Sequence, residues 1–133
     1  MTFLSQGTQG LSNQGVQGTQ GLSNQGVQGT SGPVTIPQNA QTSAYILAVS
    51  DVGKHISITT GGVTVPLSVF SAGDAVTIYN NSASNQTITQ ASSVTMYLAG
   101  TSTTGNRTLA QRGICTVLCV GSNTFVISGA GLS

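Results

Sequence analysis

The stretch that decides the fold is Gly113-Ile114-Cys115-Thr116-Val117-Leu118-Cys119-Val120-Gly121. It is predicted to form a strand, and apolar side chains would lie on both sides of that strand. One side carries Ile114, Leu118 and Val120. The other side carries Cys115, Val117 and Cys119. An antiparallel sheet normally exposes one side to water, so this strand needs a second cover. That cover is either a subunit interface, for which Cys115, Val117 and Cys119 are the candidates, or the interior of the same chain.

The two cysteines in this stretch are expected to remain free thiols. Four residues of strand span about 13 Å, whereas the Cα atoms of a disulfide lie within about 7 Å of each other. A metal site would need further ligands, and the chain offers one His and two Asp. Buried Cys behaves as a small hydrophobe, so we predict that role here and no cofactor.

Short alternating segments surround this strand and are separated by turn signals such as Gly61-Gly62 and Gly73-Asp74. The predicted strands cover residues 44–50, 54–59, 63–65, 75–80, 86–90, 94–98, 113–120 and 124–128. Helix formers such as Glu, Lys and Arg are nearly absent. The sequence therefore predicts an all-β head over residues 44–133, a small antiparallel β-sandwich or barrel.

Charged residues make up 4% of the chain. They are Asp51, Lys54, Asp74, Arg107 and Arg112. This set cannot form the basic stripe that nucleic-acid binding needs, and a surface with so little charge favours self-association. Residues 1–6 have neither a basic start nor a long apolar run, so neither a signal peptide nor a membrane insertion is expected there.

An eleven-residue repeat occupies residues 7–32, since Gly7 to Gln17 recurs unchanged as Gly18 to Gln28 and a third copy begins at Gly29. The repeat glycines are Gly7, Gly10, Gly15, Gly18, Gly21, Gly26, Gly29 and Gly32. Their spacing is that of collagen triplets with regular interruptions, and only glycine fits the axis of a triple helix.

Three structures suit this repeat: an interrupted triple helix, a three-chain β-spiral or a flexible tether. The first two need three chains, so we predict a trimeric stalk over residues 7–32. Residues 1–6 would then be an N-terminal anchor, and the proline-containing residues 33–43 would be a linker.

Catalysis is not expected, because titratable groups are few. Asp51, Lys54 and His55 are close in sequence, but the pattern is typical of a turn followed by a strand. Asp51 and Asp74 are the only pair of carboxylates that a sugar-cleaving depolymerase could use. Loops carrying aromatic, amide and guanidinium groups are candidate contacts with a host surface glycan. The residues concerned are Tyr79, Asn80, Asn81, Tyr97 and Arg107.

From Asp51 onward the sequence resembles a small module of phage tail-fibre and other virion proteins. The motifs are Asp51-x-Gly53-Lys54, Val63-Thr64-Val65-Pro66, Phe70-x-x-Gly73-Asp74-x-Val76-Thr77-Ile78 and residues 120–129. The repeat is similar to collagen-like stalks in marine cyanophage structural proteins. Many members have Trp where this chain has Phe125. The resemblance implies a β-sandwich-like head, trimers and a place in the virion, where residues 1–6 would anchor the chain to other virion proteins.

These observations together predict a non-enzymatic virion structural protein, a short homotrimeric fibre or spike whose β head serves host attachment. A capsid decoration protein that braces the shell is the alternative. An adhesin needs a pocketed loop surface at the far end of the head, whereas a decoration protein needs contacts along one side. A glycan-binding or depolymerase module is a further alternative.

Overall fold

The computed structural model describes residues 35–133, and this part of the chain is built almost entirely from strands. The strands are β1 (Gln38–Gln41), β2 (Tyr45–Ile46), β3 (His55–Ile58), β4 (Val63–Val65), β5 (Ala75–Asn80), β6 (Gln86–Gln90), β7 (Thr95–Leu98), β8 (Arg107–Gly121) and β9 (Thr124–Leu132). A 3₁₀ turn, η1 (Val49–Asp51), follows β2. The prediction of an all-β, barrel-like head is confirmed, and no helix in the described residues is long and apolar enough to cross a membrane.

The chain divides into Met1–Thr35 and Ile36–Ser133, and the second unit is the head. The predicted anchor at residues 1–6 and the predicted stalk at residues 7–32 lie outside the described residues. The same is true of the repeat glycines, Gly7, Gly10, Gly15, Gly18, Gly21, Gly26, Gly29 and Gly32. The stalk and the trimer therefore stay predictions.

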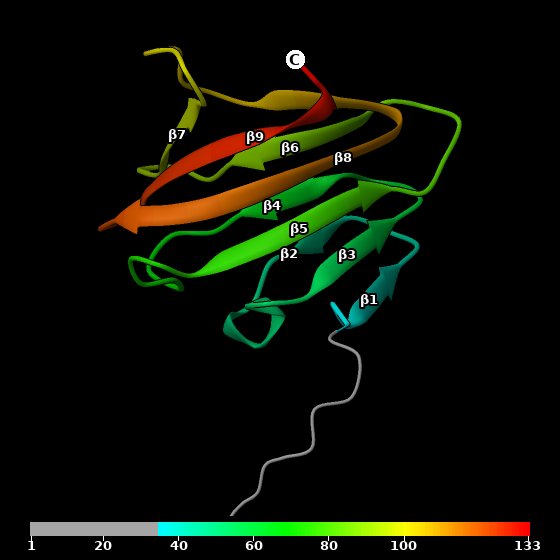
Figure 1. Ribbon diagram of the computed structural model, residues 1–133, viewed down its shortest axis with the longest axis horizontal. Coiled ribbons are helices and arrows are strands. Elements are labelled where there is room, and N and C mark those ends of the chain that lie inside the picture. Colours follow the sequence, from blue (N-terminus) through cyan, green and yellow to red (C-terminus); the bar gives the residue numbers. More distant parts are fainter. Residues whose placement is uncertain (1–34) are drawn as a thin grey trace, which may run out of the picture. The chain divides into compact units, whose positions relative to one another are not determined.

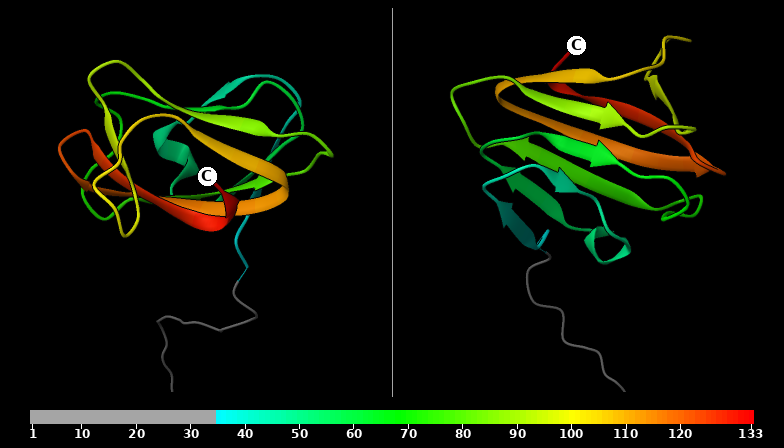
Figure 2. Two further views of the ribbon diagram at one scale, coloured as in Figure 1. Left: turned by 90° about the horizontal axis from the view of Figure 1, so that it is seen from above. Right: turned by 180° about the vertical axis from the view of Figure 1, so that it is seen from behind.

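Two ladders of parallel strands form the body of the head (Figure 1). One ladder is β1-β3-β5 and the other is β2-β4-β6, so the chain alternates between layers with every strand. Parallel neighbours need a crossover connection, and here the crossover is a strand of the opposite layer. Figure 2 shows from above that the two layers bow apart around the interior. Each pair β1-β2, β3-β4 and β5-β6 thus forms one rung of a coil.

β8 joins the two ladders at the end opposite β1 and β2. Its first residues pair antiparallel with β6, and its residues 114–118 pair antiparallel with β5. Between these parts Arg112 has a φ of 57°, which lies in the left-handed region, and the pairing with β9 shifts register. A bulge of this kind bends a strand, and here the bend carries β8 from one layer to the other. β9 follows β8 through this bend, and β7 pairs parallel with β9.

The pairing differs from the antiparallel sheet expected from the sequence. Within residues 35–133, five strand pairings are parallel and three are antiparallel. Every antiparallel pairing involves β8. The connections explain this, because Gly61 and Gly62 have positive φ and direct the chain across to the other layer instead of back along its neighbour.

Residues 38–41, expected to belong to a linker, instead form β1. The interior beside this strand is polar. Asp51 is 1% exposed, and its carboxylate accepts hydrogen bonds from Asn39 Nδ2 at 2.9 Å, Tyr45 Oη at 2.7 Å and the Ala48 amide at 2.8 Å. Gln41 donates to Asn39 Oδ1. We call Asn39, Gln41, Tyr45 and Asp51 the end network, because they close the interior at the first rung.

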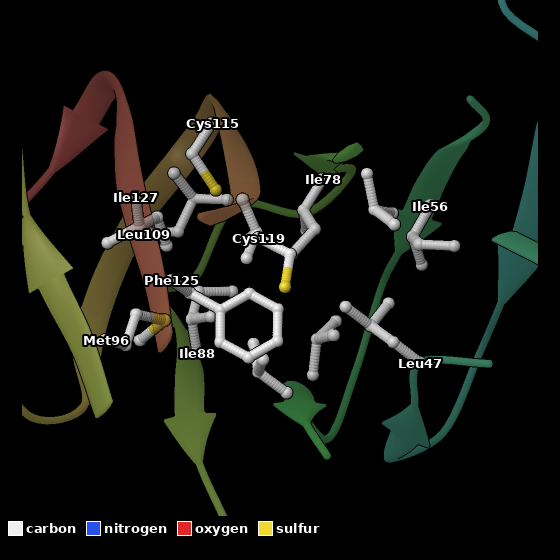
Figure 3. Close-up of a cluster of buried hydrophobic side chains, with 14 of the residues drawn as sticks. Leu47, Ile56, Ile78, Ile88, Met96, Leu109, Cys115, Cys119, Phe125 and Ile127 are labelled. Carbon is white, nitrogen blue, oxygen red and sulfur yellow. The ribbon is translucent and has the colours of Figure 1, made fainter. Parts of the chain in front are cut away.

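Apolar side chains from all rungs fill the rest of the interior (Figure 3). Ile56 and Ile58 of β3, Ile78 of β5 and Ile88 of β6 have no exposed surface. Each contributes about 1.5–3 kcal/mol through removal of its side chain from water. Phe125 of β9 packs edge-to-face on Phe70, with 6.0 Å between the ring centroids. Phe125 is therefore an aromatic residue of the core.

Two buried amides hold the loops at the bend of β8. Asn80 Nδ2 donates to the carbonyl oxygens of Leu109 and Ala110, each at 3.0 Å. Gln86 Oε1 accepts from the Gly62 amide at 2.9 Å, and its Nε2 donates to the Thr59 carbonyl at 3.0 Å. Asn80 thus satisfies backbone carbonyls at the bend of β8, and Gln86 satisfies backbone groups at the corner between β3 and β4.

Candidate interaction surface

The outward side of β8 is the most apolar exposed strand surface in the described part of the chain. Ile114 is 47% exposed, Leu118 is 39% exposed and Val120 is 46% exposed. These side chains alternate with Cys115, Val117 and Cys119, which face the core. The expectation of a strand with two apolar sides is therefore confirmed, and only one of its sides is covered by the chain itself.

The residues predicted for a subunit interface lie on the covered side. Cys115, Val117 and Cys119 are each no more than 2% exposed and pack in the core of one chain (Figure 3). A side chain enclosed by its own chain cannot contact a neighbour, so the apolar side chains that β8 offers to an interface are Ile114, Leu118 and Val120. Both thiols are free, as expected, and burial raises the pKa of Cys115 to about 12.

Strand register arranges the outward side chains of β5, β8, β9 and β7 in three rows across the sheet. The first row is Tyr79, Ile114 and Ala130. The second row is Thr77, Thr116 and Ser128. The third row is Ala75, Leu118, Val126 and Tyr97. We call these ten residues the outer face, and β5, β8 and β9 lie side by side across it in Figure 1.

The outer face has a definite chemical pattern. Its first and third rows are mainly apolar, and the row between them carries hydroxyl groups. Thr77 Oγ1 and Thr116 Oγ1 lie 3.4 Å apart across β5 and β8. No charged side chain occurs among the ten residues. Arg112 lies beyond the first row, at the bend of β8, where its guanidinium donates to Asn81 Oδ1 at 2.8 Å. His55 borders the second row through its pairing with Thr77.

No family model, curated protein or solved structure matches this chain. The role of the outer face is therefore inferred from the chemistry and arrangement of its own residues.

The candidate glycan contacts do not form one site in the structure. Tyr79 and Tyr97 belong to the first and third rows of the outer face, on β5 and β7. Asn80 has no exposed surface and is held by backbone carbonyls, so it cannot reach a glycan. Asn81 Oδ1 accepts a hydrogen bond from the Arg112 guanidinium, and Arg107 Nε donates to the neighbouring Asn106 carbonyl.

The residues considered for hydrolysis have separate structural partners. The Asp51 carboxylate is enclosed in the end network, whereas the His55 ring contacts the Ile36 carbonyl at 2.9 Å and Gln38 Oε1 at 3.3 Å. Asp74 Oδ2 accepts from the Ser71 amide in an exposed turn. Residues 35–133 contain no detected pocket and no group of three potential metal ligands.

The end network is the feature that sequence reasoning missed. Asp51-Val52-Gly53 has the composition of an ordinary turn, and nothing in that triplet indicates a buried carboxylate. Its partners Asn39 and Tyr45 come from a segment expected to be a linker and from the next strand. Burial raises the pKa of Tyr45 above its ordinary value, and the hydrogen bond to Asp51 and the charge of that carboxylate raise it further.

Proposed function

We propose that this chain is a non-enzymatic structural protein of a bacteriophage particle, a short trimeric fibre or spike that presents its β head for host attachment. The observation that carries the proposal is the outer face. Ile114 and Leu118 of the outer face, and Val120 farther along β8, remain exposed although the core of the head is already filled. Exposed apolar patches on a folded domain are typical of surfaces that contact other proteins.

The sequence supports the same proposal from a different direction. Two of the three structures that suit the repeat at residues 7–32 need three chains, and the motifs from Asp51 onward resemble those of virion proteins. With 4% charged residues, the chain also has little electrostatic repulsion between copies. Such a composition suits a protein that functions as part of a permanent assembly.

The capsid decoration protein is a second candidate, favoured by the position of the outer face. The rows lie on the side of a sheet, across β5, β8, β9 and β7, and not on a cluster of loops. Contacts along one side are what a protein bracing a shell needs. Both candidates place the chain in the virion and make contact with protein its main task.

Cryo-electron microscopy of intact particles, with mass spectrometry of their proteins, tests the proposal. We expect the chain among the particle proteins, with density for three heads around one axis at a tail or spike. Heads on the faces or vertices of the shell would favour the decoration protein instead. Absence of the chain from purified particles would contradict both candidates.

A further inference from the structure

We propose that the outer face is the contact between copies of this chain, with β8 of each copy running along a threefold axis. This rests on the proposed trimeric assembly and names the surface that would form it. The occupant of the outer face is therefore a second and a third copy of the same head, and Ile114 and Leu118 are the side chains nearest the axis.

Symmetry explains why the row pattern suits such a contact. A threefold axis parallel to β8 carries each row onto the same row of the two neighbours at the same height. Ile114 would meet Ile114, the hydroxyl row around Thr116 would meet hydroxyl rows, and Leu118 would meet Leu118. Apolar groups are then buried against apolar groups, and hydroxyl groups find hydroxyl partners, which a buried polar row requires.

Charge provides an independent reason to choose a second copy as the occupant. Near a symmetry axis every ionised group faces its own copies, so a charged residue there would be repelled by two like charges. The rows of the outer face carry no charged residue, and β9 carries none over its whole length. Arg112, the nearest cation on β8, lies beyond the first row and its guanidinium is bound to Asn81.

The position of β8 in the fold supports a permanent contact. β8 pairs with β5, β6 and β9, and its inward side chains belong to the core, so its outward side chains are held in fixed positions. A surface on such a strand loses little conformational freedom on association. Loops would offer no such rigid surface.

Sedimentation and native mass spectrometry of the full chain test the proposal. The double variant Ile114→Thr and Leu118→Thr places β-branched residues, which favour strands, at both positions and removes the two largest apolar side chains near the proposed axis. We expect the native chain to be a trimer and the association constant of the variant to fall by about 100-fold or more. The circular dichroism spectrum of the dissociated variant should stay close to that of the native chain, which separates loss of association from loss of folding.

Ile46→Thr is the matched control. Ile46 is 62% exposed on β2, in the other layer, and lies outside the outer face. Its replacement should leave the trimer unchanged. Leu118→Cys gives a second measurement, because thiols at one height near a threefold axis can form a disulfide between copies under mild oxidation. Ile46→Cys should form none, and Cys115 and Cys119 are buried and inert.

The outcomes separate this inference from the proposed function. If the double variant stays a trimer and Leu118→Cys does not cross-link, the outer face is not the contact, while the trimer itself stands. A monomeric native chain would contradict both the trimer and the inference. One introduced thiol per copy can link only two of the three chains, so a disulfide-linked pair with the third chain unlinked is the expected product. A native chain that sediments as a dimer would overturn the threefold arrangement, and cross-linking in the particle to a protein of different mass would assign the outer face to that protein.

Discussion

Asp51 shows how one side chain can hold a whole corner of the head together. Its carboxylate is buried without a cation beside it in the end network and accepts three hydrogen bonds, from Asn39, Tyr45 and the Ala48 amide. A buried carboxylate is tolerated when its lone pairs are satisfied in this way. Removing it leaves three donors unpaired at once.

We therefore expect Asp51→Ala to lower the free energy of unfolding by about 2–4 kcal/mol. Urea denaturation followed by circular dichroism measures this. Asp74→Ala is the control, because the Asp74 carboxylate accepts one exposed hydrogen bond and its loss should cost less than about 1 kcal/mol. Equal losses for the two variants would show that the end network does not stabilise the head.

The buried Cys115 thiol makes the free energy of unfolding depend on pH in the alkaline range. Its pKa is about 12 in the folded chain because of burial, against 9.0 in the absence of the fold. Below pH 9 the thiol is protonated in both states. Between these values the unfolded chain loses the proton that the folded chain keeps, so the unfolded state is favoured increasingly as pH rises.

In the wild-type chain, we expect this thiol to lower the free energy of unfolding by about 1.4 kcal/mol for each pH unit above pH 9. Cys115→Ala should remove that part of the slope, although the variant starts from a lower stability because of the smaller side chain. Urea midpoints between pH 8 and about 11 compare the two chains. Tyr45, whose raised pKa acts in the same direction, is present in both and cancels. Parallel stability curves for the two chains would contradict the prediction.

At the scale of the elements, close contact between β8 and β9 depends on glycine. A Cβ at Gly129 would overlap the Ile114 carbonyl oxygen and the Cys115 Cα on the neighbouring strand. Backbone atoms cannot move aside as a flexible side chain can. The two strands could then keep their register only by moving apart.

Gly129→Ala should therefore destabilise the head by more than about 2 kcal/mol, or prevent folding. Gly121→Ala is the matched control on β8, because a Cβ there meets no atom within 4 Å. Its effect should stay within about 1 kcal/mol. Expression yield and urea midpoint report both variants, and a Gly129→Ala head as stable as wild type would show that the strands adjust without cost.

The elements also show what the sequence reveals and what it hides. Val63–Val65, Ala75–Asn80 and Gln86–Gln90 were predicted with the bounds that the structure has, because apolar side chains alternate inside them. β1 was missed because its inward side chains, Asn39 and Gln41, are polar and join the end network. The first part of β8 was missed because its bend at Arg112 interrupts the alternation.

Pairing partners could not be predicted in the same way. Alternation tells which side of a strand is buried, but it is the same for a parallel and an antiparallel neighbour. The side of β8 available to a partner was also ambiguous, since Ile114 and Cys115 are both apolar. Only the fold, by placing Cys115 in the core, decides that Ile114 faces outward.

At the scale of the whole molecule, the small number of charged residues predicts that association of the chains depends little on salt. Contacts between charged surfaces weaken as ionic strength rises, whereas apolar contacts do not. The outer face contains no ionised group, so the association constant of the proposed trimer should change by less than about threefold between about 0.05 M and 1 M NaCl. Sedimentation equilibrium measures this, and dissociation at high salt would point to contacts made by charged residues elsewhere.

The end network also bears on whether neighbouring heads aggregate through their open strand edges. Parallel strands stacked in register are the arrangement from which amyloid fibrils grow, and growth begins at open strand edges. The edges at β1 and β2 are four and two residues long, and Pro37 directly precedes β1. An incoming strand would also meet hydrogen-bonded amides and a carboxylate where a fibril needs a dry interior. In the proposed particle, many such heads could therefore lie close together without polymerising through these edges.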